Sequence, residues 1–323
     1  MNEKKPLIEV NHLKQYFNIQ MGMFKSKPLK AVDDVSFRIE KGKTFGLVGE
    51  SGSGKSTIGK AILRYHRPTA GEVFYDGTEI GAMSEKGLLP YRKRMQSIFQ
   101  DPYSSLDPSH TVKDIICEPM EIHKMYTPAE RKERAKELIQ VVGLTQQDLL
   151  KYPHEFSGGQ RQRISIARAL SVRPEFVVCD EPISALDVSL QAQIVQMLQD
   201  LQQEFGLTYL FISHQLQVVQ KICDEIGVLY LGSLMEVSNA EMLYGNPLHP
   251  YTKMLISSIP VPDPRVKTLD NLVIDNGVQS RNIGGCKFHN RCPWCDEKCR
   301  QVVPQLTEAE PGHYVACHKY TKQ

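Results

Sequence analysis

The stretch TFGLVGESGSGKST, residues 44–57, is the most informative part of this sequence about its fold. Its first part is typical of an apolar strand that runs straight into glycines, and residues 49–57 match the pattern GxxxxGK[ST] in the required strand-then-helix order. Glycines allow backbone N–H groups to approach phosphate oxygens, and the following helix directs its positive N-terminus at them. The stretch predicts a phosphate-binding loop in which Lys55 contacts the β- and γ-phosphates and Ser56 binds Mg²⁺; the alternative is a glycine-rich turn that matches by accident.

The composition is that of an ordinary soluble globular protein. The chain has 323 residues, of which 41% are hydrophobic and 24% charged, so it is long enough for one large domain or two smaller ones. A formal net charge of +2 gives no electrostatic reason to expect nucleic acid as a partner. The N-terminus lacks the apolar core of a signal peptide, and no apolar run reaches the roughly 18 to 20 residues that span a bilayer. We therefore expect the chain to stay in the cytoplasm.

Short β-rich runs alternate with helical ones, which predicts an α/β fold with a mainly parallel sheet. The expected strands are 7–10, 35–39, 44–49, 175–181 and 208–214, and residues 21–30 are expected to form a surface loop. Thr127, Pro128 and Glu130 predict a capped helix start. The apolar face of that helix is expected to be Ala135, Leu138, Ile139 and Val142.

Two carboxylates follow the apolar strand FVVC. Asp180 and Glu181 stand at its carboxyl end, where α/β sheets bind their ligands. Such a pair is by itself more often a helix cap or a solvated turn. Together with a phosphate loop, it predicts Asp180 in the Mg²⁺ shell and Glu181 as the general base that polarises the attacking water.

The segment FSGGQRQR, residues 156–163, discriminates best among nucleotide-binding proteins. Taken alone, Ser157, Gly158 and Gly159 read as an N-cap serine with flexible glycines at a helix start. The full run, however, resembles the signature of the nucleotide-binding subunits of ATP-binding-cassette (ABC) transporters. The resemblance implies that Ser157, Gly158, Gly159 and Gln160 meet the γ-phosphate held by a partner subunit.

Further motifs of that family occur in the expected order and extend the resemblance over about residues 7 to 245. Gln100 resembles the Q-loop glutamine that senses Mg²⁺, Asp187 in SALD resembles the D-loop, and His214 resembles the switch histidine that contacts the γ-phosphate as a second catalytic residue. Gln215 departs from the aspartate expected there. The nucleotide-binding residues that the resemblance implies are Tyr16, Gly49, Ser51, Gly52, Ser53, Gly54, Lys55, Ser56, Thr57, Gln100 and Asp180, with Ser56, Gln100 and Asp180 around the metal. Tyr16 would stack on adenine, although core packing is an alternative for it.

The segments QDPYSSLDP, PHEFSGGQRQR and HPYTKMLISSIPVPDP resemble the oligopeptide and dipeptide importers, and among them the second of two related ATPase subunits. The resemblance implies a P-loop ABC ATPase fold over residues 1–245 with a helical subdomain at about 101–170, then a proline-rich helix and linker over 246–285. It also implies a heterodimer with a related ATPase, two transmembrane permeases and an extracytoplasmic binding protein, with this chain peripheral on the cytoplasmic face of the membrane. Relatives carry peptides, nickel chelates, glutathione-like compounds or oligosaccharides, so the cargo stays open.

Four cysteines fall within CKFHNRCPWCDEKC, residues 286–299. In a reducing cytoplasm, a cluster of this kind predicts metal binding or catalysis rather than disulfides. The tail of the same transporters resembles residues 286–323, and the resemblance implies a small cysteine-rich domain with a [4Fe-4S] cluster on Cys286, Cys292, Cys299 and Cys317. A structural Zn²⁺ is the alternative. Cys295 is a spare thiol or an alternative ligand.

Two other functional classes remain possible. A soluble cassette ATPase of repair or translation typically carries two cassettes or long coiled coils, and the sequence has neither. A protein that is mainly an iron or redox sensor would use the cysteine-rich tail as its principal site. Co-purification with hydrophobic permeases would distinguish a transporter subunit from both.

Overall fold

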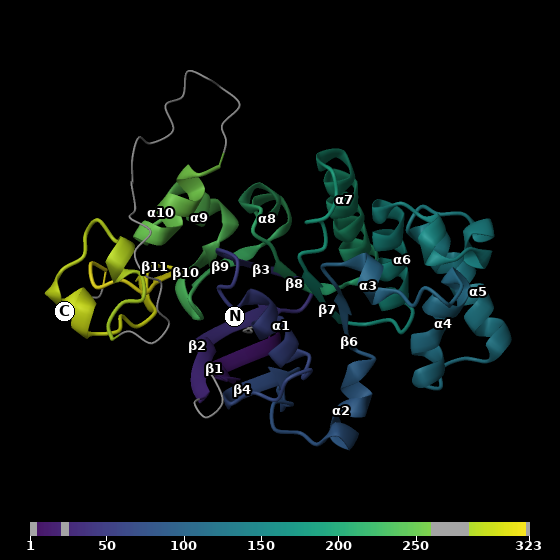
Figure 1. Ribbon diagram of the computed structural model, residues 1–323, viewed down its shortest axis with the longest axis horizontal. Helices are drawn as coiled ribbons and strands as arrows, with labels where there is room; N and C mark the ends of the chain where they lie inside the picture. The colour runs from purple at the N-terminus through teal and green to yellow at the C-terminus, as the bar shows by residue number, and fades with distance from the viewer. Residues whose placement is uncertain (1–4, 21–25, 260–283, 321–323) are drawn as a thin grey trace. The chain divides into compact units, whose positions relative to one another are not determined.

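The structure is a computed structural model that describes residues 5–20, 26–259 and 284–320. These residues form two compact units. Figure 1 labels their helices and strands. Unit 1 takes in the described parts of residues 1–7, 39–43 and 83–212, and unit 2 those of 8–38, 44–82 and 213–323. Each unit is described by itself.

The first sheet of unit 2 is a four-stranded sheet of order β2-β1-β4-β5. β1 pairs antiparallel with β4, with Ile8 opposite Tyr75. Residues 26–30 belong to β2, so the predicted loop is wrong there, while residues 21–25 lie outside the described part. β2 is an edge strand, and edge strands tolerate lysine and proline. Because loops are also rich in these residues, the composition of residues 26–30 does not distinguish a strand from a loop. The strands are β1 (Pro6–Gln20), β2 (Ser26–Glu40), β4 (Ala70–Tyr75) and β5 (Thr78–Glu79).

A second set of strands in unit 2 has the order β11-β12-β10-β9-β3. β3 is buried at every position and pairs in parallel with β9, as expected of a continuous apolar strand. The other pairs are antiparallel, and β12 places the C-terminal tail directly beside β10. The strands are β3 (Thr44–Val48), β9 (Glu225–Tyr230), β10 (Ser233–Asn239), β11 (Thr307–Glu310) and β12 (His313–Val315).

The described part of unit 2 contains six helical segments, which join or follow these strands. α10 lies in the proline-rich segment, where a helix was expected, and residues 260–283 of the predicted linker fall outside the described part. The segments are α1 (Lys55–Ile62), α8 (Leu216–Ile222), α9 (Ala240–Gly245), α10 (Pro250–Ser257), the 3-10 helix η3 (His289–Arg291) and α11 (Glu297–Gln301).

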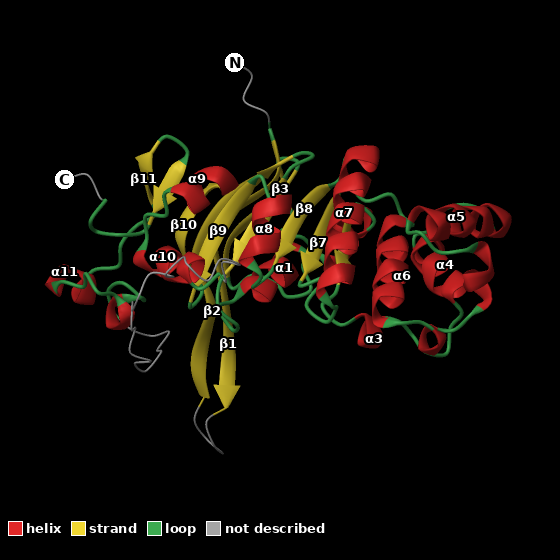
Figure 2. Cartoon of the chain, turned by 90° about the horizontal axis from the view of Figure 1, so that it is seen from above, coloured by secondary structure: helices red, strands yellow, loops and turns green. Residues whose placement is uncertain are grey.

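Unit 1 combines three parallel strands with helices. β6 (Met95–Ile98), β7 (Phe176–Asp180) and β8 (Thr208–Ile212) pair in parallel in that order, so the strands expected at 175–181 and 208–214 are confirmed. Figure 2 shows α3, α4, α5 and α6 grouped together, and these helices contact one another. The helical segments are α2 (Glu85–Arg92), α3 (Pro102–Ser105), α4 (Val112–Ile122), α5 (Pro128–Val141), η1 (Gln146–Leu150), η2 (Pro153–Glu155), α6 (Gly158–Leu170) and α7 (Val188–Phe205).

The capped start predicted for α5 is confirmed. The Thr127 hydroxyl accepts the backbone N–H of Glu130, and the Glu130 carboxylate accepts the backbone N–H of Thr127 at 2.7 Å. Two orphan N–H groups at the helix start are thereby satisfied. The predicted apolar face is also confirmed, since the side chains that form it are fully buried: Ala135, Leu138, Ile139 and Val142.

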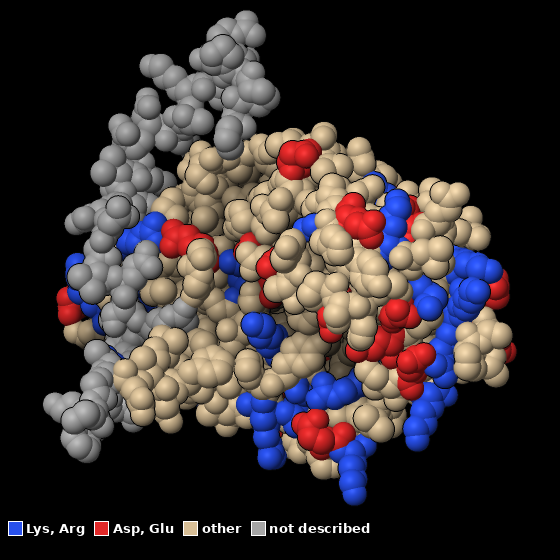
Figure 3. All heavy atoms as spheres, turned by 45° about the vertical axis from the view of Figure 1, so that its right-hand side comes forward, with Lys and Arg blue, Asp and Glu red and all other residues tan. Residues whose placement is uncertain are grey.

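Within the described ranges, no helix is both long and apolar enough to cross a membrane. On the face of the molecule in Figure 3, basic and acidic side chains are interspersed. That distribution accords with the small net charge of +2.

Candidate nucleotide site

The predicted phosphate loop connects β3 to α1 in unit 2. The Lys55 ammonium is buried and donates hydrogen bonds to the carbonyls of Gly49 at 2.8 Å and Glu50 at 3.0 Å. The Ser53 N–H also donates to the Glu50 carbonyl, at 3.1 Å. The loop is therefore wrapped around its own lysine, which stands at the start of the helix.

Two glycines allow this path. Gly49 has φ +149°, and a Cβ there would lie 2.1 Å from the carbonyl oxygen of Leu229. Gly54 has φ +112°, and a Cβ there would lie 2.4 Å from the carbonyl oxygen of Ala31. Any side chain at either position would collide with backbone, so both positions require glycine.

The start of α1 suits an anion. No side chain caps the helix, and no acidic residue stands in its first turn. Its N-terminal N–H groups and the positive end of the helix dipole therefore face the loop without a competing carboxylate from the helix. The Ser53 hydroxyl is buried without a hydrogen-bond partner among the described residues. Around it, the predicted residues Ser51 and Gly52 are exposed, whereas Ser56 and Thr57 are half-buried in the first helical turn.

His214, also in unit 2, is exposed just before α8. The neighbouring Gln215 occupies the N-cap position of α8 and makes no side-chain cap hydrogen bond. Its backbone N–H donates to the Ser213 hydroxyl at 3.0 Å. A glutamine in place of the expected aspartate thus leaves this short helix without a side-chain cap.

Unit 1 brings together three of the predicted residues. Asp180 ends β7, and Glu181 follows it with φ +47°, a left-handed conformation that is uncommon outside glycine. The backbone N–H of Glu181 donates to the Ile212 carbonyl of β8 at 2.9 Å, which fixes this turn. The Gln100 amide donates to the Glu181 carboxylate at 3.1 Å. Strained residues of this kind cluster at functional sites, where the surrounding structure holds them in place.

The predicted signature residues form the start of α6. Ser157 is the N-cap: its hydroxyl accepts the Gln160 N–H at 3.4 Å, and the Gln160 side chain accepts the Ser157 N–H at 3.0 Å. Gly158 and Gly159 are the first residues of the helix. Asp187 of the predicted D-loop caps α7 and accepts hydrogen bonds from the Leu190 N–H and the Ser189 hydroxyl, which lower the pKa of its carboxyl.

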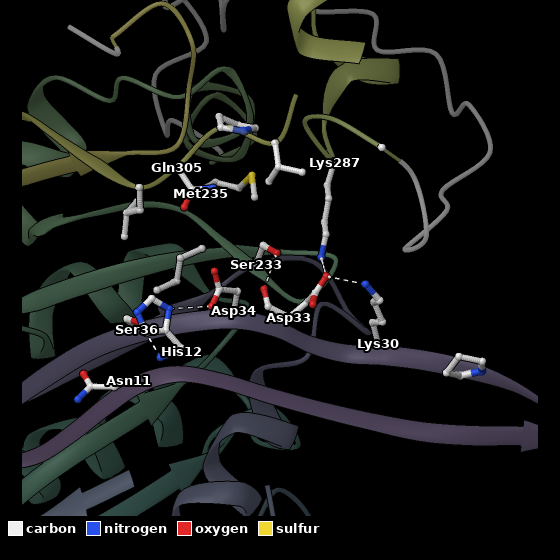
Figure 4. A pocket seen from close by; sticks show the side chains of 16 residues that line it. Asn11, His12, Lys30, Asp33, Asp34, Ser36, Ser233, Met235, Lys287 and Gln305 are labelled. Carbon is white, nitrogen blue, oxygen red and sulfur yellow. Dashed lines mark hydrogen bonds and ion pairs between the residues drawn. The ribbon is translucent and has the colours of Figure 1, made fainter. Parts of the chain in front are cut away.

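The Tyr16 side chain contacts Asp33, a lining residue of a pocket of about 710 Å³ in unit 2 that is shown in Figure 4. Its hydroxyl donates to Asp33 at 2.5 Å, and Lys287 of the C-terminal tail approaches the other Asp33 oxygen at 3.3 Å. Lys30 approaches that oxygen as well, as Figure 4 shows. Burial raises the pKa of Asp33, but the Tyr16 hydrogen bond and the Lys287 charge outweigh it, so that this pKa lies below its usual value.

Sequence reasoning missed Glu50 and Arg291. Glu50 occupies a variable position of the phosphate-loop pattern, and its two carboxylate oxygens lie 2.9 and 3.0 Å from Nη1 of Arg291, one residue before Cys292. The Glu50 N–H donates to the Tyr251 hydroxyl at 2.9 Å. An acidic residue inside a loop expected to bind phosphate is the signal that calls for a cationic partner elsewhere in the chain.

The four predicted cluster cysteines line one small pocket of about 20 Å³ in the tail, and Cys295 is not among its lining residues. All eight cysteines are free thiols. Burial raises the pKa of Cys286 to about 12, and burial is also the largest cause that raises the pKa of Cys299 to about 11. Over the described ranges, no three His, Cys, Asp or Glu side chains form a group that could hold a metal ion as they stand.

Comparisons with known proteins agree with this geometry. The ABC transporter family model matches residues 32–184, and the model of the oligopeptide/dipeptide transporter C-terminal region matches residues 235–299. The putative oligopeptide transport ATP-binding protein YkfD of Bacillus subtilis is 52% identical over 319 residues, with 98% of this chain and 96% of YkfD covered. The oligopeptide transport ATP-binding protein OppF of the same organism is 50% identical, with 98% and 97% covered.

A solved structure gives the same fold. The ATP-binding cassette MJ0796, in a dimeric post-hydrolysis state bound to ADP and phosphate, is similar with a TM-score of 0.65 and 27% identity over 72% of this chain and 98% of that one. The α/β prediction is confirmed as the P-loop fold of ABC ATPases. With half of its residues shared with relatives over nearly the full length, the chain belongs to the oligopeptide-transport ATP-binding proteins, the ATPases of ABC transporters.

Proposed function

We propose that this ATPase powers the uptake of oligopeptides or dipeptides across the cytoplasmic membrane. The observation that carries the proposal is the match of residues 235–299 to the C-terminal region of oligopeptide and dipeptide transporters, in a chain whose phosphate loop is intact. The names of the full-length relatives point to the same cargo.

The roles of the site residues follow from their chemistry. Lys55 and the loop N–H groups would hold the phosphates, and Ser56, Asp180 and Gln100 would surround Mg²⁺. Glu181 would accept a proton from water as the water oxygen attacks the γ-phosphorus and the bond to the β-phosphate oxygen breaks. The support for Glu181 is its fixed turn and its hydrogen bond from Gln100. His214 would contact the γ-phosphate, and Tyr16 would stack on adenine.

One phosphate loop and one signature occur in the chain, so closing ATP between a loop and a signature requires a second subunit. We propose a related ATPase as that partner, with Ser157, Gly158, Gly159 and Gln160 facing the partner's γ-phosphate and Asp187 linking the two sites. Two permeases and an extracytoplasmic binding protein would complete the transporter. In that assembly, the chain lies on the cytoplasmic face of the membrane, and nucleic acid plays no part.

For the tail, we propose a small C-terminal domain over residues 286–323 that carries a [4Fe-4S] cluster on Cys286, Cys292, Cys299 and Cys317. Four soft thiol ligands around one pocket are the donor set that such a cluster requires. The pocket itself holds about one water, so the cysteine loops would have to part to admit a cluster. A single Zn²⁺ needs less room and is the alternative. Because metals bind thiolates, raised thiol pKa values make binding release protons.

The transport proposal is tested with the assembled transporter in lipid vesicles. ATP-dependent accumulation of a labelled pentapeptide is expected with the parent chain and is lost with Lys55→Ala. Accumulation of a nickel chelate, glutathione or an oligosaccharide in place of peptides would change the cargo. Steady ATP hydrolysis by the chain without any membrane partner, and no accumulation of any of these compounds, would instead favour a soluble ATPase or a sensor.

A further inference from the structure

Glu50 places a carboxylate inside the loop that is proposed to bind the phosphates of ATP. Like charges repel, and the repulsion grows where water is excluded, so an uncompensated carboxylate here would oppose nucleotide binding. Nη1 of Arg291 lies 2.9 and 3.0 Å from the two oxygens of Glu50. Arg291 thus supplies the compensating charge from a point 241 residues further along the chain.

Arg291 is held firmly. Its side chain is 9% exposed, and its guanidinium carbon lies 5.7 Å from the ring centre of Tyr230 and 5.6 Å from that of Phe288. A guanidinium that packs against two aromatic rings gains cation–π attraction, which opposes its movement into water. The positive charge therefore stays beside the loop.

Glu50 is also tethered through its backbone. Its N–H donates to the buried Tyr251 hydroxyl of α10, and its carbonyl accepts from Lys55. The Arg291 contact is the tether on the side chain. Residues of α10 and of the C-terminal tail thus set the conformation of the first half of the phosphate loop.

We propose that Arg291 is a positioning residue of the ATP site: it neutralises Glu50 and fixes it in the loop, so that the triphosphate meets N–H groups and Lys55 rather than a bare carboxylate. This inference rests on the proposed phosphate site. Arg291 directly precedes Cys292, which lines the cysteine pocket, so a change in that pocket would be expected to displace this side chain.

The test measures the dissociation constant of a fluorescent ATP analogue with the purified full-length chain and Mg²⁺. Arg291→Gln is expected to raise it about tenfold, because the Glu50 charge is then uncompensated. Glu50→Gln is expected to lower it about threefold, since Arg291 then faces the phosphates alone. The double variant E50Q/R291Q should return to within about threefold of the parent. A purely structural role for Arg291 would not produce this rescue.

Three further measurements extend the test. The Arg291→Gln defect should shrink between about 0.05 and 0.5 M salt, because screening weakens the Glu50 repulsion. Arg300→Gln, an exposed arginine of the same tail, serves as the matched control and should bind like the parent. Lys55→Ala tests the site itself: if it leaves binding unchanged, the proposed phosphate site is wrong.

If Lys55→Ala abolishes binding while Arg291→Gln stays within twofold of the parent, only the inference about Arg291 is overturned. Failure of the double variant to rescue binding would overturn it as well. If Arg291→Gln does not fold, Glu50→Gln alone tests the proposal. Tighter binding of the ATP analogue by Glu50→Gln would support it, and unchanged or weaker binding would contradict it.

Discussion

Glu236 joins the C-terminal tail to the rest of unit 2, and changing it to glutamine should loosen that junction. The side chain is fully buried in β10. Its carboxylate accepts the N–H groups of Leu248 at 2.7 Å and His249 at 2.8 Å, and it lies 2.7 Å from Nε2 of His313 in β12. In Glu236→Gln, an amide NH₂ group replaces one carboxylate oxygen. That NH₂ group cannot accept the backbone N–H that the oxygen accepted, so two donors face each other.

The magnitude follows from those contacts. At least one charge-assisted hydrogen bond is lost, worth about 1.5 to 3 kcal/mol, and a buried N–H is left without an acceptor, which costs about 1 to 3 kcal/mol more. We therefore expect a loss of about 3 kcal/mol in the local opening free energy. That corresponds to about 10²-fold faster amide exchange.

Hydrogen–deuterium exchange followed by mass spectrometry measures this locally, which matters because a chain of two units need not unfold in one step. Peptides that cover β12 and residues 248–251 should exchange faster, while those of α5 in unit 1 stay unchanged. Glu241→Gln, an exposed glutamate in the first turn of α9, is the matched control. If residues 248–251 of Glu236→Gln exchange within threefold of the parent rate, the Glu236 carboxylate does not hold this junction.

Three more outcomes are expected. Ser157→Arg places bulk and charge at the start of α6, so the chain should still bind ATP while turnover in the assembled transporter falls; normal peptide uptake would show that this helix start does not meet nucleotide. For the proposed [4Fe-4S] cluster, Cys292→Ser should lower the iron content of anaerobically purified protein and, through the neighbouring Arg291, raise the dissociation constant for ATP, whereas Cys295→Ser should be nearly silent; the reverse pattern would exchange the two cysteines as ligands, and a parent protein without iron would exclude the cluster. Burial lowers the pKa of His249 to about 4, below the usual 6.5. Between pH 6.5 and about 4 the unfolded state therefore binds more protons than the folded state. The free energy of unfolding of unit 2 should fall by on the order of 3 kcal/mol as pH falls from 7 to 4. His249→Asn, which keeps an acceptor for the Tyr251 N–H, should flatten this loss in urea unfolding, and an unchanged slope would exclude His249 as its source.

Motifs whose residues are close in sequence and also close in space could be predicted from the sequence alone. The GxxxxGK[ST] run, the Asp180–Glu181 pair after an apolar strand and the Thr127–Glu130 capping box each depend on residues a few positions apart. The place of each motif in a strand, loop or helix could therefore be predicted without knowing the tertiary structure, and the roles of the site residues stay predictions.

Contacts between distant segments could not be predicted in this way. Glu50 and Arg291 are 241 residues apart, and Asp33 and Lys287 are 254 apart, so no periodicity or motif spacing connects them. β12 likewise joins the cysteine-rich tail to β10 through backbone hydrogen bonds, which depend little on side-chain identity. Residues 26–30 of the edge strand β2 cannot be distinguished from a loop by composition, because lysine and proline suit both.

Glu181 is proposed as the general base of ATP hydrolysis, and a variant that removes its carboxylate measures that role. ATP binding and ATP turnover are measured on the assembled transporter with Glu181→Gln, and with Glu204→Gln, an exposed glutamate of α7, as control. We expect Glu181→Gln to keep ATP bound while turnover falls by about 10² to 10⁴-fold, and the control to behave like the parent. Turnover by Glu181→Gln within about threefold of the parent would contradict it.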